Sequence, residues 1–92
     1  MRYITIDGNT ATIKVDGRYD LCNTLDVQFE LDTAFMDGCT KVIVDFRDTT
    51  EIDSSVLMNL LKIRQRTGDE NFEVRRAKDK VLEKLTEWKL VR

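Results

Sequence analysis

One aspartate and two serines, Asp53, Ser54 and Ser55, interrupt the otherwise core-like segment VIVDFRDTTEIDSSVLMNLLKI. A serine hydroxyl can act as a nucleophile, accept a phosphate or help to begin a helix. With Asp53 as N-cap, its carboxylate can accept a hydrogen bond from the backbone N–H of Ser55 or Val56. Both serines then fall in the first helical turn, where their hydroxyls lie beside free helix N–H groups.

The chain lacks the groups that usually activate a serine nucleophile. It contains no histidine, which is the commonest general base, and no GxSxG elbow. A Ser-Lys pair stays open, although nothing points to one, and Asp48 and Glu51 suggest acid–base chemistry only weakly because we expect their loop to be solvated. The four glycines stand far apart and form no phosphate-cradling loop. We therefore expect a protein that is not an enzyme and needs no metal or cofactor.

A phosphate on a serine of this turn would be compatible with the fold. It adds about −1.5 to −2 charges at pH 7, and a helix N-terminus offers unpaired N–H groups and a favourable dipole. The simpler interpretation is that these polar residues only begin a helix. The preceding buried strand favours a functional site, because sites in open α/β sheets lie at the carboxyl ends of such strands.

A helical wheel for the segment after Asp53 separates the two serines. At about 100° per residue, Ser54 lies at the border of the apolar face, beside Met58. Ser55 lies in the middle of the polar stripe. The residues predicted to face water are Ser55, Asn59, Lys62 and Arg66, and those predicted to face the core are Val56, Leu57, Leu60 and Ile63.

Length, composition and charge limit the kind of protein. Ninety-two residues make one domain, 1–92, that buries only about 60 to 65 % of its unfolded surface. No apolar run approaches the ~18 residues of a membrane span. The start reads as a strand, and with only Cys22 and Cys39 we expect a cytoplasmic protein with reduced thiols. A net charge of −2 and a pI near 5.1 argue against nucleic-acid binding.

The net charge hides a division along the chain. Residues 16–53 carry three bases and ten acids, a net −7, whereas residues 54–92 carry ten bases and six acids, a net +4. The acidic part ends at the serines. An acidic segment that converges on Ser54 predicts a partner with a basic patch.

Alternation and helical spacing predict the elements. YITIDGNTATIKV alternates on both sides of Asp7-Gly8, which predicts an antiparallel hairpin. The unbroken apolar run KVIVDF predicts a central strand that is buried on both faces. Helices are expected over 54–67 and in KDKVLEKLTEW, where Val81, Leu82 and Leu85 would face inward. NFEVRR predicts a more exposed strand between them, and KLVR a short final strand.

A first helix is expected in RYDLCNTLDVQFELDTAFMDG, with Asn23 as N-cap and Gly38 at its end. It has two apolar stripes, whereas a surface helix normally needs one. The preferred interpretation packs the first stripe on the sheet and the second on a neighbouring helix; the alternative is a dimer or partner surface. The stripes are Val27, Leu31, Ala34 and Phe35, and Leu25, Phe29 and Met36.

The predicted order is therefore β-β-α-β-α-β-α-(β), an α/β fold with helices packed on one mixed sheet. With this order of elements and the motifs below, the chain resembles a STAS domain, the family of bacterial anti-sigma-factor antagonists. VIVDFRDTTEIDSSVLMNLL is similar to the family's buried strand, its D-L-S-x-x-x-x-I-D-S-S-G-L segment and the helix that follows. VDGRYD resembles the family's G-x-L-D at Gly17 and Asp20, and KVLEKLTEWKLVR its last helix and terminal strand. The resemblance runs over nearly the whole chain.

The resemblance implies a protein-binding switch. The unphosphorylated antagonist would bind an anti-sigma factor that is also a serine kinase, and so release a sigma factor. Phosphorylation of Ser54 would break that complex and a serine phosphatase would restore it. Asp53 would cap the helix and contact the kinase, Asp20 would lie nearby in the adjacent loop, and Ser55 would belong to the partner-binding surface.

Two residues depart from the family pattern. The family usually places glycine after the two serines and often again two residues later, where this chain has Val56 and Met58. Val56 would alter how a kinase closes over Ser54, while Met58 would offer the partner an adaptable apolar side chain. The alternative function is a constitutive STAS scaffold or regulatory subunit of a transport or sensory complex, without phosphorylation. In either case we expect a monomer that binds neither nucleic acid nor membrane.

Overall fold

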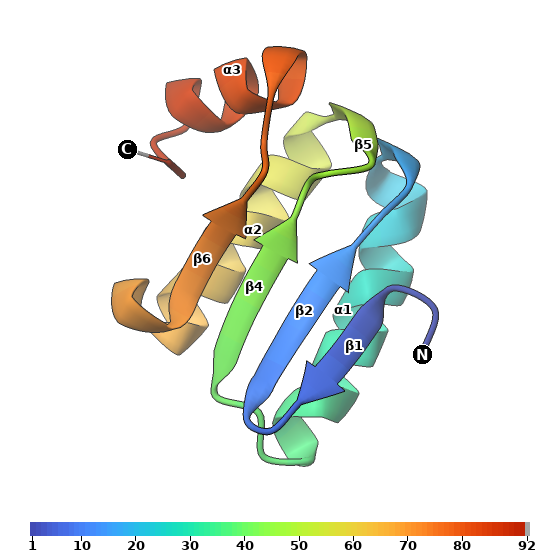
Figure 1. The fold of residues 1–92 in the computed structure, drawn as a ribbon, viewed down its shortest axis with the longest axis vertical. Coiled ribbons are helices and arrows are strands. Elements are labelled where there is room, and N and C mark those ends of the chain that lie inside the picture. Colours follow the sequence, from blue (N-terminus) through green and yellow to red (C-terminus); the bar gives the residue numbers. More distant parts are fainter. Residues whose placement is uncertain (92) are drawn as a thin grey trace.

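The computed structural model describes residues 1–91, and its main feature is a four-stranded sheet in the order β1-β2-β4-β6 (Figure 1). The strands are β1 (Ile4–Asp7), β2 (Thr10–Lys14), β4 (Lys41–Asp45) and β6 (Phe72–Arg75). β1 runs antiparallel to β2, whereas β2, β4 and β6 are parallel. The mixed sheet and the central place of KVIVDF are confirmed.

The tight turn between β1 and β2 follows from one glycine. Asp7 pairs with Thr10, so only two residues connect the strands. Gly8 lies in the left-handed region at φ 61°, which glycine adopts without steric cost. The hairpin predicted around Asp7-Gly8 is confirmed.

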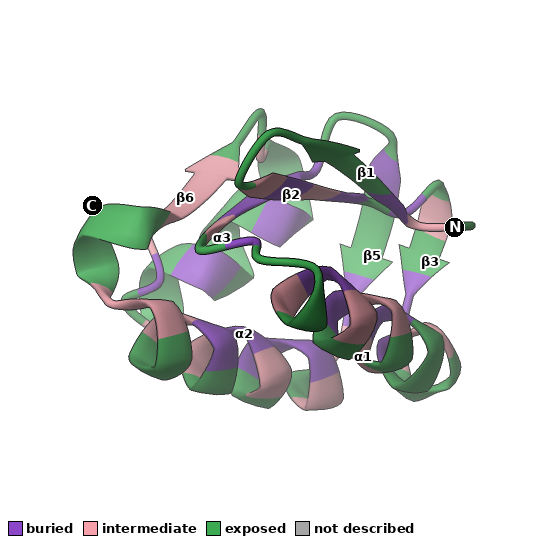
Figure 2. Cartoon of the chain, turned by 90° about the horizontal axis from the view of Figure 1, so that it is seen from below, coloured by how far each residue is buried: buried purple, intermediate pink, exposed green. Residues whose placement is uncertain are grey.

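Two long helices cover one face of this sheet. They are α1 (Leu21–Met36) and α2 (Ser54–Thr67), which lie side by side in one layer (Figure 2). A short 3-10 turn, η1 (Asp69–Asn71), leads into β6, and α3 (Asp79–Glu87) lies beyond the carboxyl end of β6 (Figure 1). The predicted α/β fold is thus confirmed. None of the helices in residues 1–91 has the length and apolar character needed to span a bilayer.

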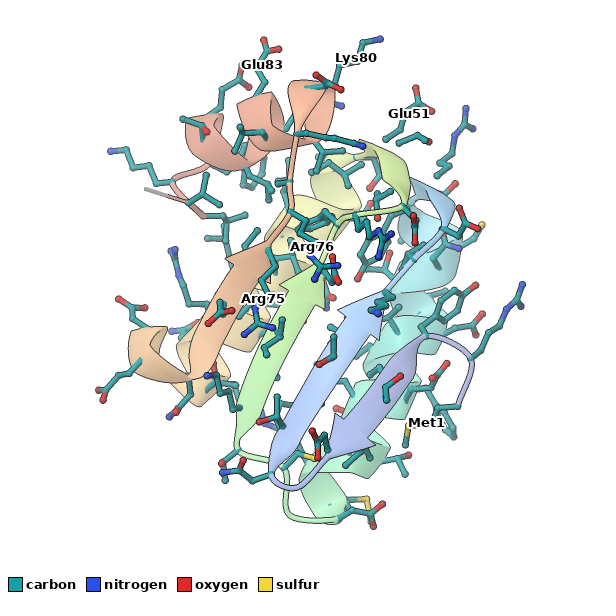
Figure 3. The ribbon with its side chains drawn as sticks, in the orientation of Figure 1. Met1, Glu51, Arg75, Arg76, Lys80 and Glu83 are labelled. Carbon is teal, nitrogen blue, oxygen red and sulfur yellow. The ribbon has the colours of Figure 1, made fainter. Side chains whose placement is uncertain are left out.

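Within residues 1–91, the other face of the sheet carries no helix. Val42 and Val44 of β4 belong to the main core, while the alternating residues Ile43 and Asp45 point to the open face. Both are nevertheless buried. Basic side chains from β6 and the loop after it, Arg75 and Arg76, lie over this face (Figure 3), and Arg76 Nη1 stands 3.7 Å from Asp45 Oδ2. Burial of β4 on both faces is therefore confirmed, with polar side chains covering the second face.

A second, two-stranded parallel sheet was not expected from the sequence. It consists of β3 (Gly17–Tyr19) and β5 (Thr49–Ile52), which follow β2 and β4 in the chain. Figure 2 shows both strands running from the layer of the main sheet toward the helix layer. The buried hydroxyl of Thr49 donates a 2.6 Å hydrogen bond to the carbonyl of Val15 and so fixes the start of this sheet. Each strand ends directly before a helix.

The predicted end of the chain is partly wrong. Val81 and Leu85 of α3 are buried as expected, but Leu82 is exposed. Lys89 has φ 57° and Leu90 N–H donates to the carbonyl of Leu85, so the chain turns back after the helix. Leu90 packs into the core in this turn, and no strand forms over 89–91. Arg92, the last residue of the predicted strand, lies outside the described residues.

Tyr19 is the largest fully buried side chain of the core, and its hydroxyl has no hydrogen-bond partner within residues 1–91. Burial also raises the pKa of Tyr19 well above its ordinary value. We expect Tyr19→Phe to raise the free energy of unfolding by about 1 kcal/mol, because a buried unpaired hydroxyl costs at least that much. For a domain of this size the melting temperature should rise by about 4 to 8 °C.

Two comparisons test this prediction by thermal melting. Tyr3→Phe is the matched control, because the Tyr3 hydroxyl accepts a 3.2 Å hydrogen bond from Asn23 Nδ2; it should lower the melting temperature slightly. Above about pH 10 the unfolded state ionises Tyr19 and the folded state does not, so the wild type should lose stability with rising pH faster than Tyr19→Phe. A lower melting temperature for Tyr19→Phe at pH 7 would contradict the account.

Candidate functional site

The small sheet brings the two helix caps together. Tyr19, the last residue of β3, pairs with Ile52, the last residue of β5. Each strand is followed by an aspartate: Asp20 after β3 and Asp53 after β5. Because the strands are parallel, both aspartates leave the sheet at the same end. In the sequence only a family resemblance placed Asp20 near the serine turn, and the pairing of these strands is the physical cause of that proximity.

Asp53 caps both helices. Its Oδ1 accepts a 3.1 Å hydrogen bond from the N–H of Val56, which confirms the expected cap of α2. Its Oδ2 accepts a second bond, 3.2 Å long, from the N–H of Leu21 at the start of α1. One half-buried carboxylate therefore satisfies unpaired donors of two helix N-termini. This link between the helices was not predicted.

The predicted N-cap of α1 was wrong. Asp20, and not Asn23, is the cap: Asp20 Oδ1 accepts from the N–H of Cys22 at 3.0 Å, and Asn23 Oδ1 accepts from the N–H of Asp20 at 2.9 Å. This reciprocal pattern is a capping box. The helix begins three residues earlier than Asn23 would allow. The spacing Asp20-x-x-Asn23 was the signal in the sequence that could have revealed it.

The wheel placed Ser55 in the wrong environment. Ser54 is exposed, whereas Ser55 is half-buried, as is Asn59 one turn later. The cause is α1, which packs along this flank of α2; Asn59 Nδ2 donates to Gln28 Oε1 of α1 at 2.8 Å. The wheel treated the flank of α2 as open to water. Its other assignments hold, since the predicted core residues are buried and Lys62 and Arg66 are exposed.

Residues on either side of Ser54 line two hollows. One, of about 340 Å³, contains Asp20 and Asp53, and the other, of about 280 Å³, lies between α1 and α2 and contains Ser55 and Met58. Ser54 stands in the chain between the residues that line them. The full lining of the first is Arg18, Tyr19, Asp20, Glu51, Ile52, Asp53 and Lys84, and that of the second Leu21, Thr24, Leu25, Gln28, Ser55, Met58, Asn59 and Lys62.

Charges of both signs surround the first hollow. Arg18 Nε lies 3.1 Å from Glu51 Oε2, and Lys84 Nζ of α3 donates a 2.8 Å hydrogen bond to the carbonyl of Ile52. Glu51 projects outward beside this region in Figure 3. Sequence reasoning missed Lys84, since it comes from the far end of the chain and no local pattern connects it with the serines. Within residues 1–91 no three His, Cys, Asp or Glu side chains are grouped to hold a metal ion.

Comparison with known proteins bears on the fold. No family model matches the sequence, and no curated protein matches it either. Among solved structures, the chain is similar to one described as "a putative anti-sigma factor antagonist" from Thermotoga maritima. The TM-score is 0.80 at 17% sequence identity, over 95% of this chain and 77% of that one. The chain therefore has the STAS fold of that protein, as the strand and helix order and the DSS segment predicted.

Proposed function

We propose that this chain is an anti-sigma-factor antagonist. In its unphosphorylated form it binds an anti-sigma factor with serine kinase activity and so frees a sigma factor, and phosphorylation of Ser54 ends that binding. A serine phosphatase reverses the modification. The protein acts in the cytoplasm as a binding partner and kinase substrate, not as an enzyme. The shared fold with the Thermotoga maritima protein supports the general role.

The observation that carries the proposal is the placement of Ser54. It is an exposed residue at the first position of a capped helix, between two hollows that contain the other proposed contact residues. A kinase can reach its hydroxyl without opening the fold. The phosphate would lie at a helix N-terminus, where the dipole and unpaired N–H groups favour an anion. Phosphorylation can therefore change the surface and leave the fold intact.

Val56, the main departure from the family pattern, leaves the start of α2 and the access to Ser54 unchanged. Its side chain is completely buried in the core, so it does not stand between Ser54 and a partner. Met58 is exposed and lies with Ser55 in the hollow between the helices. A partner that covers Ser54 thus also meets an adaptable apolar side chain.

The test is the site of phosphorylation. We expect an anti-sigma serine kinase encoded beside this chain's gene to transfer one phosphate from ATP to Ser54, because Ser54 is exposed and Ser55 is partly covered by α1. Mass spectrometry of the digested product locates the phosphate. Ser54→Ala should abolish the modification, and Ser55→Ala, the matched control, should retain it. Phosphate on Ser55 alone, or on neither serine, would instead favour the constitutive scaffold.

A further inference from the structure

The second apolar stripe of α1 is exposed, which corrects the expectation that a neighbouring helix covers it. Leu25 is 68% exposed, Phe29 75% and Met36 88%, and Leu21 at the start of the helix is 56% exposed. These four residues form the α1 stripe. Of the first stripe, Val27, Leu31 and Ala34 are buried as predicted and Phe35 is partly buried against the core, so α1 is held on the sheet by its other face.

The α1 stripe lies along one side of the helix. At about 100° per residue its four members fall within an arc of about 80°, and at 1.5 Å per residue they extend over about 22 Å of helix. Single exposed apolar residues are common on protein surfaces, whereas a contiguous apolar patch marks an interaction site. The outer surface of α1 in Figure 2 is correspondingly exposed along the helix.

α2 contacts α1 beside the stripe and does not cover it. Polar pairs join the helices there: Gln28 with Asn59, and Asp32 with Arg66, whose guanidinium lies 3.5 Å from the Asp32 carboxylate. The start of the stripe continues into the hollow between the helices, since Leu21 and Leu25 line it together with Met58. The exposed apolar surface therefore reaches from the serine turn to the far end of α1.

The charged residues of α1 itself have one sign, while the bases Lys62 and Arg66 of α2 lie on the α2 side of the stripe. Residues 20–37 contain five acids and no base. Three of these acids are engaged within the fold: Asp20 caps α1, Asp32 pairs with Arg66, and Glu30 Oε1 accepts from the N–H groups of Tyr3 and Ile4. Asp26 and Asp37 are exposed and form no ion pair within the described residues. On the wheel they lie on the side of the stripe away from α2, and so provide an acidic edge.

An apolar stripe with an acidic edge complements a basic amphipathic helix. Such a helix places its own apolar residues on the stripe, as helix-in-groove complexes do, and its Lys or Arg residues beside Asp26 and Asp37. A second copy of this chain fits less well, because antiparallel packing of two α1 helices brings the acidic edges together. An anionic membrane is repelled for the same reason.

We propose that the α1 stripe is a docking surface for a basic amphipathic helix of a partner protein. The outer half of the stripe needs no phosphate on Ser54, because Phe29 and Met36 lie two or more turns away from the start of α1 and belong to neither hollow. The stripe is therefore a second binding surface whose outer half does not depend on phosphorylation of Ser54, and this goes beyond the proposed function.

A synthetic peptide tests the proposal. The probe is a fluorescein-labelled 18-residue helix with a leucine stripe edged by lysines, and its control has glutamates in place of the lysines. Fluorescence anisotropy should show binding of the lysine peptide, with affinity falling as salt rises, and none of the glutamate peptide. Phe29→Ser with Met36→Ser should weaken binding at least tenfold, and Asp26→Asn with Asp37→Asn should remove most of the salt dependence.

Leu82→Ser is the matched control, because Leu82 is an exposed leucine on α3; it should bind the peptide like the wild type. All these variants should melt like the wild type, since the altered side chains lie outside the core. Equal binding of both peptides, or unchanged binding by the Phe29/Met36 variant, overturns the proposal. So does a concentration-dependent dimer that this variant abolishes. The peptide contains no kinase, so these outcomes are independent of Ser54 phosphorylation.

Discussion

Ser54→Asp should weaken binding of the anti-sigma kinase at least about tenfold, equivalent to about 1.4 kcal/mol, with little change in melting temperature. Ser54 is exposed, and its hydroxyl forms no hydrogen bond within residues 1–91, so the fold loses no contact. A carboxylate in the first turn of α2 is also favoured by the helix dipole. In the complex, however, this charge is buried beside the Asp53 carboxylate, which costs several kcal/mol unless the partner supplies a cation.

The measurement is calorimetric titration of the kinase with wild-type and variant protein at one salt concentration. Ser54→Asn is the matched control, since asparagine has the shape of aspartate without its charge, and it should bind much more tightly than Ser54→Asp. Ser54→Ala should bind like the unphosphorylated wild type and resist the kinase. Equal affinities for the aspartate and asparagine variants would show that the added charge does not cause the loss of binding.

Asp53→Ala should cause the largest loss of stability among the site variants, about 2 kcal/mol. One helix cap is worth about 0.5 to 2 kcal/mol, and Asp53 accepts hydrogen bonds from the first turns of both α1 and α2. Its removal leaves two donors without their acceptor and loosens the contact between the helices. For a domain of this size the melting temperature should fall by roughly 8 to 16 °C.

Urea unfolding of two comparison variants isolates the cause. Asp53→Asn keeps an acceptor oxygen and is a good N-cap, so it should retain most of the stability. Asp26→Ala removes an exposed acid of α1 that forms no ion pair within the described residues, and should change stability little. If Asp53→Ala unfolds at the same urea concentration as Asp26→Ala, Asp53 does not join the two helices in solution.

Local patterns were sufficient for the main elements. Alternation around Asp7-Gly8 predicted the hairpin, and the apolar run KVIVDF predicted the central strand. Asp53 was recognised as the cap of α2 from its position before the serines. The hairpin and the cap of α2 depend on contacts within a few residues of the chain. The central strand depends on how many consecutive residues are apolar. Both properties can be read from a linear sequence.

The small sheet and the start of α1 were not predicted. β3 and β5 have only three and four residues, too short for alternation to be distinctive, and they exist because each completes the hydrogen bonds of the other. Asn23 and Asp20 are both acceptable caps by residue type. The hydrogen bond from the Leu21 N–H to Asp53 Oδ2 belongs to the tertiary structure and selects the earlier start.

The exposure of individual helix residues was decided by the relative placement of the helices. A wheel shows which residues share a face, and it correctly grouped Leu25, Phe29 and Met36, as well as Ser55 and Asn59. It cannot show whether another element covers that face. In the folded chain α1 covers the side of α2 that carries Ser55, while no element within residues 1–91 covers the stripe of α1. The sequence thus determined the faces of each helix, and tertiary packing decided which face meets solvent, because burial depends on neighbours that are distant in the chain.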